Sequence, residues 1–393
     1  MSEWNYVSLN EALKIIRKNS RHLREREKVS IDLALGRRLA TDIRAKYDLP
    51  MWNRSAVDGY ALRSRECRKG TVLSVVGHIS AGQFSTRNMR KGECIYVATG
   101  APVPSGADAV IMKEFVESRG DEIRLLRSVS AHENISLRGS DVRKGQLLAA
   151  EGKEVSSGII GAAASQGIAE LEVYRKPRVA ILPGGDEIAP VGTELSPGQI
   201  YDINSHVIAS VALSSGAEVK SFEPLRDTPE AVNGALELTS SYDVLVFCSG
   251  SSVGERDYVA EAIRQNGRLL FHGVKIRPGR PCMFGVVRGK AVLGLPGYPV
   301  SSFVGAHYLL RTCLKCMQGL EMKQQFVKCR FRGKERADGE FDRVIPVSIR
   351  NGVCRSVFKE SGAISSISMA DGLLLLPGGK SIRENDSVTV EVL

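Results

Sequence analysis

The sequence lacks the features that mark a membrane or secreted protein. No apolar run approaches the roughly 20 residues that span a bilayer, and residues 1–16 lack the charged-then-apolar plan of a signal peptide. We therefore expect a cytoplasmic protein. The eight cysteines are scattered, and the lone CxxC pair, Cys313 and Cys316, has no second pair at zinc-site spacing. Reduced thiols are expected rather than a metal centre.

Aromatic residues are also scarce, at 6% of the chain, and no dense block of Lys and Arg is present. The net charge is nevertheless +10, because 54 Lys and Arg outweigh 44 Asp and Glu. This balance favours small anionic substrates over nucleic acid or a membrane surface. The six histidines are scattered and form no constellation typical of a catalyst.

At 393 residues, the chain is long enough for two to four domains. Short strands and turns from Gly70 to Arg138 predict a small β domain, and the same pattern returns from Phe326 to Leu393. Between them, residues 176 to about 320 alternate strand and helix, which predicts a parallel sheet with helical crossovers.

Three loops of this α/β region consist largely of small residues. Gly184–Glu187, Ser249–Gly254 and Gly294–Ser301 each follow a predicted strand and precede a predicted helix. The carboxyl ends of parallel strands meet at one sheet edge, where such loops bind phosphates. The loops match neither GxGxxG nor GxxxxGK[ST], which disfavours a dinucleotide dehydrogenase and a P-loop NTPase.

Charged residues in other loops complete a candidate anion site. Arg277 and Arg280 flank the turn Pro278-Gly279, an arrangement that suits an oxyanion, although a solvated basic turn is the alternative. The loop carboxylates are typical caps and turn residues, but gathered at one cleft they would hold magnesium. They are Asp58, Asp141, Asp186, Glu187, Asp202, Asp227 and Asp257. The segment 48–61 around Asp58 is either an ordered turn or a loop held for function.

Short motifs along nearly the whole chain resemble one family, the molybdopterin molybdenumtransferases, which includes the E domain of gephyrin. The motifs are Ser55-Ala-Val-Asp-Gly-Tyr-Ala61, Thr99-Gly-Ala-Pro-Val-Pro104, Gly185-Asp-Glu187, Tyr201-Asp-Ile-Asn204, Ser252-Val-Gly254 with Asp257, Pro278-Gly279 with Pro281, Gly294-Leu-Pro-Gly with Pro299-Val-Ser301, Gly362-Ala-Ile-Ser-Ser366 and Ala370-Asp-Gly372. Each motif is short, but so many motifs in the same order as in the family make the match specific.

The resemblance implies a fold and a reaction. It implies a helical linker domain (1–45 with 139–175), an inserted β-rich domain (46–138), a three-layer α/β molybdopterin-binding domain with a parallel-type sheet (176–322) and a small C-terminal β-barrel (323–393). It also implies a homodimer whose cleft lies between the α/β domain and the partner's N-terminal region. Adenylylated molybdopterin and molybdate or tungstate would react with Mg²⁺ to release AMP and finished cofactor. The molybdopterin adenylyltransferase is a further expected partner.

The resemblance also implies site residues, each at a position of this sequence that matches a family motif. The catalytic set is Asp58, Thr99, Asp141, Glu187 and Asp257, with Glu187 and Asp257 expected at magnesium. The substrate-binding set is Ser55, Arg138, Asp227, Gly250, Ser252, Gly254, Arg277, Arg280, Pro296, Pro299 and Ser301. Asp58 and Asp141 would act from across the dimer.

The chain departs from the family pattern at four places. Pro183-Gly184 replaces Ser-Thr, Ser249 replaces a glycine, Arg277 and Arg280 replace lysines, and Tyr298 replaces Asn. These changes leave the choice between molybdate and tungstate open. Two other functions agree less well with the sequence. The retained carboxylates disfavour an interaction protein that keeps the fold, and the matching terminal regions disfavour a nucleotide-processing enzyme.

Overall fold

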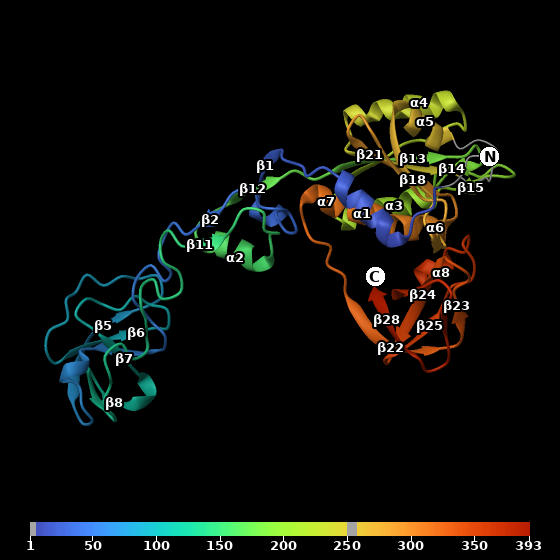
Figure 1. Cartoon of the computed structure of the whole chain (residues 1–393). Coiled ribbons are helices and arrows are strands. Elements are labelled where there is room, and N and C mark those ends of the chain that lie inside the picture. The colour runs from blue at the N-terminus through green and yellow to red at the C-terminus, as the bar shows by residue number, and fades with distance from the viewer. Residues whose placement is uncertain (1–4, 250–257) are drawn as a thin grey trace.

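The computed structural model describes residues 5–249 and 258–393 and shows an elongated molecule (Figure 1). A β-rich domain lies at one end, and a narrow linker joins it to the α/β domain at the other. The C-terminal β domain packs beside the α/β domain. Within the described ranges, no helix is both long and apolar enough to cross a membrane.

The N-terminal β domain is built on one six-stranded sheet with the order β7-β4-β6-β5-β9-β8. Its strands are β4 (Gly59–Leu62), β5 (Val72–Ile79), β6 (Glu93–Val97), β7 (Ala109–Met112), β8 (Val116–Arg119) and β9 (Glu122–Leu125), and the short strands β3 (Arg54–Ser55) and β10 (Ile135–Ser136) pair beside it. Because strand side chains alternate, Leu62 and Ile111 enter one apolar cluster while Ala61 and Val110 enter another.

The linker consists of two thin antiparallel ribbons and one helix. β1 (Arg26–Ser30) pairs with β12 (Glu170–Tyr174), β2 (Ile43–Arg44) pairs with β11 (Leu147–Ala149), and α2 (Ser157–Ser165) packs on β11. The N-terminal helix α1 (Leu9–Asn19), which falls within the predicted linker segment 1–45, packs on the α/β domain. Its apolar face, including Leu9 and Ile16, is buried in the core of the α/β domain, which offers the larger apolar surface. A capping box of Ser8 and Glu11 begins the helix.

The α/β domain has three layers, as predicted, but its sheet is mixed. The strand order is β16 (Glu218–Ser221), β13 (Arg178–Gly184), β17 (Val244–Ser249), β21 (Lys290–Pro296), β20 (Met283–Val287) and β18 (Gly267–His272). The first four are parallel, whereas β20 is antiparallel to both neighbours. The tight turn at Arg288-Gly289, with positive φ at both residues, joins β20 directly to β21 and imposes this reversal.

Helices cover both faces of this sheet. On one face lie α1, α3 (Asn204–Ser214) and the long helix formed by α6 (Pro299–Gly305), η5 (Ala306–Leu310) and α7 (Arg311–Gln318). On the other lie α4 (Pro229–Ala235) and α5 (Tyr258–Asn266). The buried run of β17, Val244 to Cys248, contributes alternate residues to the two cores. β17 is therefore buried on both faces.

The C-terminal domain is the predicted small barrel. Its strands are β22 (Phe326–Arg332), β24 (Asp342–Arg350), β25 (Val353–Ser356), β26 (Gly372–Leu376) and β28 (Ser387–Val392), and pairing of β24 with β26 closes the ring. The short strand β19 (Ile276–Arg277) of the α/β domain pairs with β24. The two domains are therefore tied together by backbone hydrogen bonds as well as by side chains.

A buried ion cluster fixes the linker to the α/β domain. Asp243, with 4% of its side chain exposed, accepts hydrogen bonds from Arg175 Nη1 at 2.6 Å, Lys290 Nζ at 2.9 Å and the Arg178 amide at 3.0 Å. Burial alone would raise the pKa of Asp243, but these donors outweigh it and lower the pKa to about 2. The cluster sits where β12 leads into β13, so it holds the direction in which the linker leaves the domain.

Candidate functional site

Three strand ends of the α/β sheet come together in register. Gly184 of β13 pairs with Ser249 of β17, and Ser249 pairs with Pro296 of β21. Gly184 also forms a parallel bridge with Leu225, just before Asp227. The prediction that small-residue loops meet at one sheet edge is confirmed for these ends. Gly250, Ser252, Gly254 and Asp257 lie outside the described residues.

Glu187 lies beside Gly185 at this edge. Gly185 has a φ of 132°, and a Cβ built on it would lie 2.7 Å from Glu187 Oε2. The Glu187 carboxylate therefore folds back over the glycine, and only a residue without a side chain leaves it that room. Glu187 and Asp227 are both exposed to solvent.

The turn between β21 and α6 is held from two sides. Asn204, the first residue of α3, donates from Nδ2 to the Gly297 carbonyl at 2.6 Å. Val300 N donates to the Ser361 carbonyl of the C-terminal domain at 3.0 Å. Pro299 is the first residue of α6, and Ser301 is only 5% exposed. The Ser301 side chain is therefore part of the packing under the edge, not an open substrate contact.

Arg277 and Arg280 extend from the loop after β18 and share an aromatic neighbour. The Arg277 guanidinium lies 4.6 Å from the centre of the Phe341 ring, and that of Arg280 lies 5.6 Å from it. Arg280 also hydrogen bonds to Tyr6 and covers its ring at 5.0 Å. Both arginines are exposed. The rings hold two positive charges side by side while leaving them open to an anion.

The edge is wide. From β16, next to Asp227, to β18, next to Arg277, five strand spacings of about 4.8 Å amount to roughly 24 Å. The strands that lead to Asp227 and to the two arginines therefore lie at opposite sides of the sheet. Asp227 and the arginines can contact different parts of one extended anionic ligand.

The N-terminal β domain carries a second polar cluster. Asp58 Oδ1 accepts hydrogen bonds from both the amide and the hydroxyl of Thr99, each at 2.8 Å, and Lys113 Nζ lies 3.5 Å from Oδ2. These donors lower the pKa of Asp58, chiefly through the Thr99 amide. The carboxylate remains 41% exposed, so an ionised oxygen is held in place and available.

Other predicted residues of this domain have different environments. Arg138 Nε donates to Asp48 Oδ2 at 2.7 Å, while Asp141 is exposed and its side chain has no hydrogen bond with any described residue. Ser55 is 1% exposed and donates to the Val57 carbonyl at 2.5 Å. Its hydroxyl shapes the turn before Asp58 and does not face a ligand.

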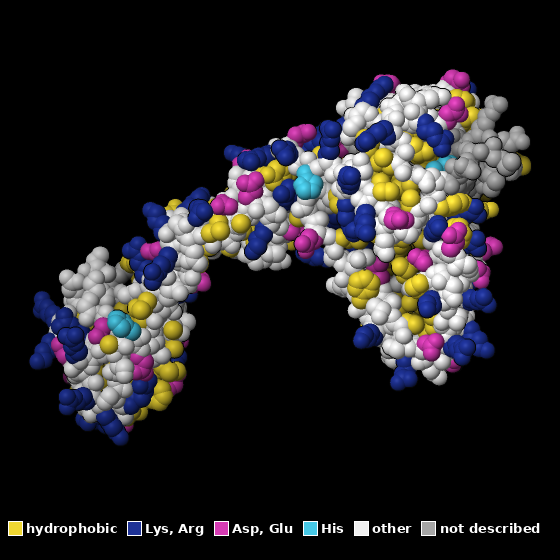
Figure 2. All heavy atoms as spheres, viewed as in Figure 1, with side chains coloured by type: hydrophobic (Ala, Val, Ile, Leu, Met, Phe, Trp, Pro, Cys, Tyr) yellow, Lys and Arg dark blue, Asp and Glu magenta, His cyan; other side chains and the backbone are white. Residues whose placement is uncertain are grey.

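The two groups of predicted residues do not meet within one chain. The loops at the sheet edge, marked by β14 (Ile188–Ala189) and β15 (Ile200–Tyr201), point away from the linker, and the N-terminal β domain lies at the opposite end (Figure 1). The space-filling view shows the same separation, with Lys and Arg spread over every domain (Figure 2). Across residues 5–249 and 258–393, no three His, Cys, Asp or Glu side chains gather as metal ligands.

The cysteines take no part in either group. All eight are free, and Cys248, beneath the sheet edge, has its pKa raised by burial to about 12. The expectation of reduced thiols agrees with this arrangement.

Sequence reasoning missed several residues that support the site. Lys113, Asn204, Phe341 and Ser361 contact predicted residues from distant parts of the chain. Asn204 had a signal, because it ends the motif Tyr201-Asp-Ile-Asn204, but it was not among the predicted site residues. The other three lie outside the motifs that define the candidate site.

Comparison with known sequences gives a consistent result along the chain. Three family descriptions match in order: "MoeA N-terminal region (domain I and II)" at residues 7–167, "Probable molybdopterin binding domain" at residues 187–315 and "MoeA C-terminal region (domain IV)" at residues 328–393. A molybdopterin molybdenumtransferase of Staphylococcus epidermidis is 31% identical over 95% of this chain and 92% of its own length. One from Staphylococcus aureus is 31% identical over 89% and 87%.

Solved structures agree with the sequences. The molybdopterin biosynthesis MoeA protein from Pyrococcus horikosii superposes with a TM-score of 0.85 at 33% identity, covering 98% of this chain and 99% of that one. A second, from Pyrococcus horikoshii OT3, gives 0.79 at 30% identity, covering 99% and 100%.

Proposed function

Because this chain belongs to the MoeA family of molybdopterin molybdenumtransferases and so inserts molybdenum during molybdenum cofactor biosynthesis, we propose that its organic substrate is adenylylated molybdopterin. Molybdate is the second substrate, and AMP and the finished cofactor are the products. The observation that carries this proposal is the shared edge at Gly184, Ser249 and Pro296. An edge about 24 Å wide with cations at one end suits a long, phosphorylated ligand better than a single small anion.

We assign roles along this edge by charge. Arg277 and Arg280 attract the oxyanion or a phosphate, since planar guanidinium groups donate in pairs to such oxygens. Pro296 and Pro299 shape the turn that faces the ligand, and Asn204 fixes the carbonyl between them. Asp227 lies at the far end, where it would accept hydrogen bonds from uncharged parts of the ligand.

We further propose that the working site is shared between two subunits. Asp58 and Thr99 belong to the N-terminal β domain, which lies at the opposite end of the molecule from the loops marked by β14 and β15. A two-fold dimer can bring one subunit's N-terminal β domain to the other's sheet edge (Figure 1). Asp58 is suited to act there because its carboxylate is ionised, positioned and exposed. Asp141 and Arg138 would approach from the same side.

Magnesium fits this site in the way it usually binds phosphorylated substrates, through one or two carboxylates together with phosphate oxygens. Glu187 is an exposed carboxylate at the phosphate edge, and Asp257 is the second expected donor, outside the described residues. When bound, the ion would offset the charge of the departing AMP. Delivery by the adenylyltransferase and a cytoplasmic location remain predictions.

Replacing Gly185 tests the role of Glu187. In Gly185→Ala the new Cβ must displace the Glu187 carboxylate, so we expect the magnesium concentration for half-maximal turnover to rise about tenfold. The matched control is Gly192→Ala, which also has a positive φ, 92°, but whose Cβ would meet nothing within 4 Å. An equal response of both variants would mean that backbone strain, not Glu187, sets the magnesium requirement.

The reaction itself is tested by incubating the protein with adenylylated molybdopterin, Mg²⁺ and molybdate, with tungstate in parallel. We expect AMP release and active cofactor that depend on the oxyanion. Absence of oxyanion-dependent AMP release would refute the proposed substrate. The ratio of the two rates would also show which oxyanion the Arg277 and Arg280 pair selects.

A further inference from the structure

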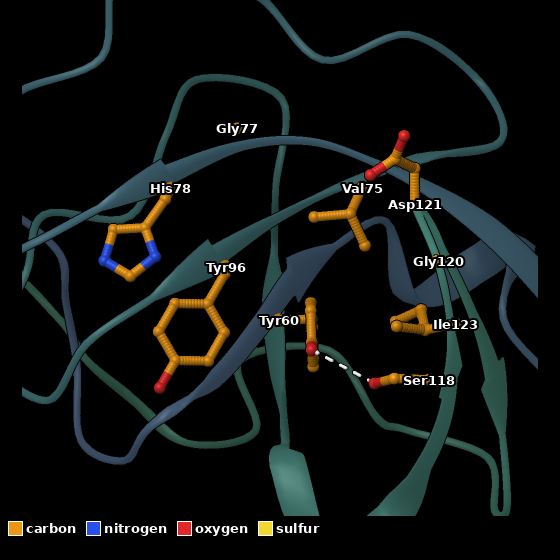
Figure 3. A pocket seen from close by; sticks show the side chains of 9 residues that line it. All are labelled: Tyr60, Val75, Gly77, His78, Tyr96, Ser118, Gly120, Asp121 and Ile123. Atoms are coloured by element: carbon orange, nitrogen blue, oxygen red, sulfur yellow. Dashed lines mark hydrogen bonds between the residues drawn. The ribbon is translucent and has the colours of Figure 1, made fainter.

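A pocket on the N-terminal β domain is lined by three aromatic rings from adjacent strands (Figure 3). Tyr60 of β4 pairs with Tyr96 of β6, and His78 of β5 pairs with Tyr96 on its other side. The His78 and Tyr96 rings stack, with centres 4.7 Å apart and planes 18° apart, while Tyr60 meets Tyr96 edge-on at 5.3 Å. The sheet thus presents a preformed aromatic wall.

The rest of the pocket is partly apolar, with Val75, Gly77 and Ile123, and partly polar. Ser118, Gly120 and Asp121, from the hairpin of β8 and β9, line it, and the Tyr60 hydroxyl lies 3.4 Å from Ser118 Oγ (Figure 3). Its volume is about 370 Å³, within the range of small-molecule sites. The Asp121 carboxylate is exposed and makes no hydrogen bond with the described part of the chain, so it is open to a donor from a ligand.

The pocket adjoins the Asp58 cluster. Because β4 and β6 are antiparallel, the start of one lies beside the end of the other, where Asp58 and Thr99 meet. Asp58 precedes Tyr60 by two residues, about 7 Å along the strand. The backbone at Asp58 therefore lies close to the backbone that carries Tyr60 of the aromatic wall.

We propose that this pocket binds a planar, amino-substituted nitrogen heterocycle. The aromatic wall provides a surface for stacking, and Asp121, Ser118 and Tyr60 provide acceptors for ring N–H and amino groups. The identity of the ring rests on the proposed function, because adenylylated molybdopterin carries two such rings, a pterin and an adenine. The pocket would receive one of them from a substrate held at the partner's sheet edge.

Direct binding to the full chain tests this site without turnover. The probes are biopterin, followed by quenching of its fluorescence, and AMP, followed by calorimetry. We expect His78→Ala and Tyr60→Leu each to weaken the binding of one of these probes about fivefold or more, since stacking on an aromatic residue contributes that much to the affinity. Weaker binding of biopterin would identify the ring in the pocket as the pterin, and weaker binding of AMP would identify it as the adenine. His78 is exposed, so its variant should fold even if Tyr60→Leu does not.

The control is Tyr47→Leu, an exposed tyrosine of the linker, which should bind both probes as the wild type does. Failure of both probes to bind, or binding that neither pocket variant changes, would overturn the proposal. If AMP bound only at the α/β domain, its affinity would be the same in both pocket variants as in the wild type. The oxyanion-dependent AMP assay is separate, so failure of the pocket leaves the proposed reaction standing.

Discussion

Asp58→Ala is expected to lower the rate of molybdenum insertion by about a hundredfold or more while the protein remains folded. The carboxylate is held by Thr99 and Lys113 but stays 41% exposed, an arrangement that positions a charge rather than stabilises a core. Turnover of adenylylated molybdopterin with saturating Mg²⁺ and molybdate measures the loss. Thermal unfolding of the same sample shows whether the fold is kept.

The matched control for Asp58 is Glu122→Ala, an exposed carboxylate on β9 of the same domain. It should retain wild-type turnover because it lies outside the polar cluster. Should Asp58→Ala retain most of its activity, the cluster would have no part in the reaction. Thr99→Val should give a smaller loss, since it removes one of the two hydrogen bonds that hold Asp58 Oδ1.

Asp243→Ala should have the largest effect on stability. Arg175 would be left only 12% exposed and without its buried partner, and breaking such a pair by removing one member lowers the free energy of unfolding by about 3–5 kcal/mol. Urea unfolding followed by circular dichroism measures the change. Glu237→Ala breaks the exposed pair with Arg288, and it should leave the urea midpoint nearly unchanged.

The same carboxylate predicts a dependence on pH. The folded pKa of Asp243, about 2, lies below its ordinary value near 4, so its contribution to stability is fully present above pH 4. That contribution is lost as the pH falls towards 2. The gap in urea midpoint between the wild type and Asp243→Asn should therefore be constant above pH 5 and shrink below pH 4. A gap that grows on acidification would contradict this assignment.

Much of the site architecture could be predicted because the relevant signals are local. An apolar strand followed by small residues and a helix start occurs three times in the α/β region, and a parallel sheet must bring those ends together. The Ser-x-x-Glu pattern that caps α1 at Ser8 is a signal of the same local kind. Local signals also predict the two small β domains.

Long-range packing is harder to predict from the sequence. The apolar face of α1 required a partner, but nothing local showed that the partner was α7 rather than the linker. The antiparallel placement of β20 depends on the turn at Arg288-Gly289, whose backbone geometry only the structure displays. Ser55 and Ser301 match the family motifs, yet burial removes both side chains from the ligand side.

The structure shows why arginines suit positions 277 and 280. Phe341 lies against both guanidinium groups, and a planar guanidinium stacks on an aromatic ring in a way that an ammonium group does not. The pair therefore keeps two charges at the edge in a fixed orientation. This arrangement connects the C-terminal barrel to the anion site through one ring.

The shared site is the central claim, and a mixed dimer tests it most directly. Asp58→Ala and Glu187→Ala chains are co-expressed with different tags, and the dimer carrying both tags is purified. One of its two sites then combines both substitutions and the other neither, so about half of the wild-type activity should return although each variant alone is inactive. A mixed dimer as inactive as its parents would place both residues in the same subunit's site and contradict the account.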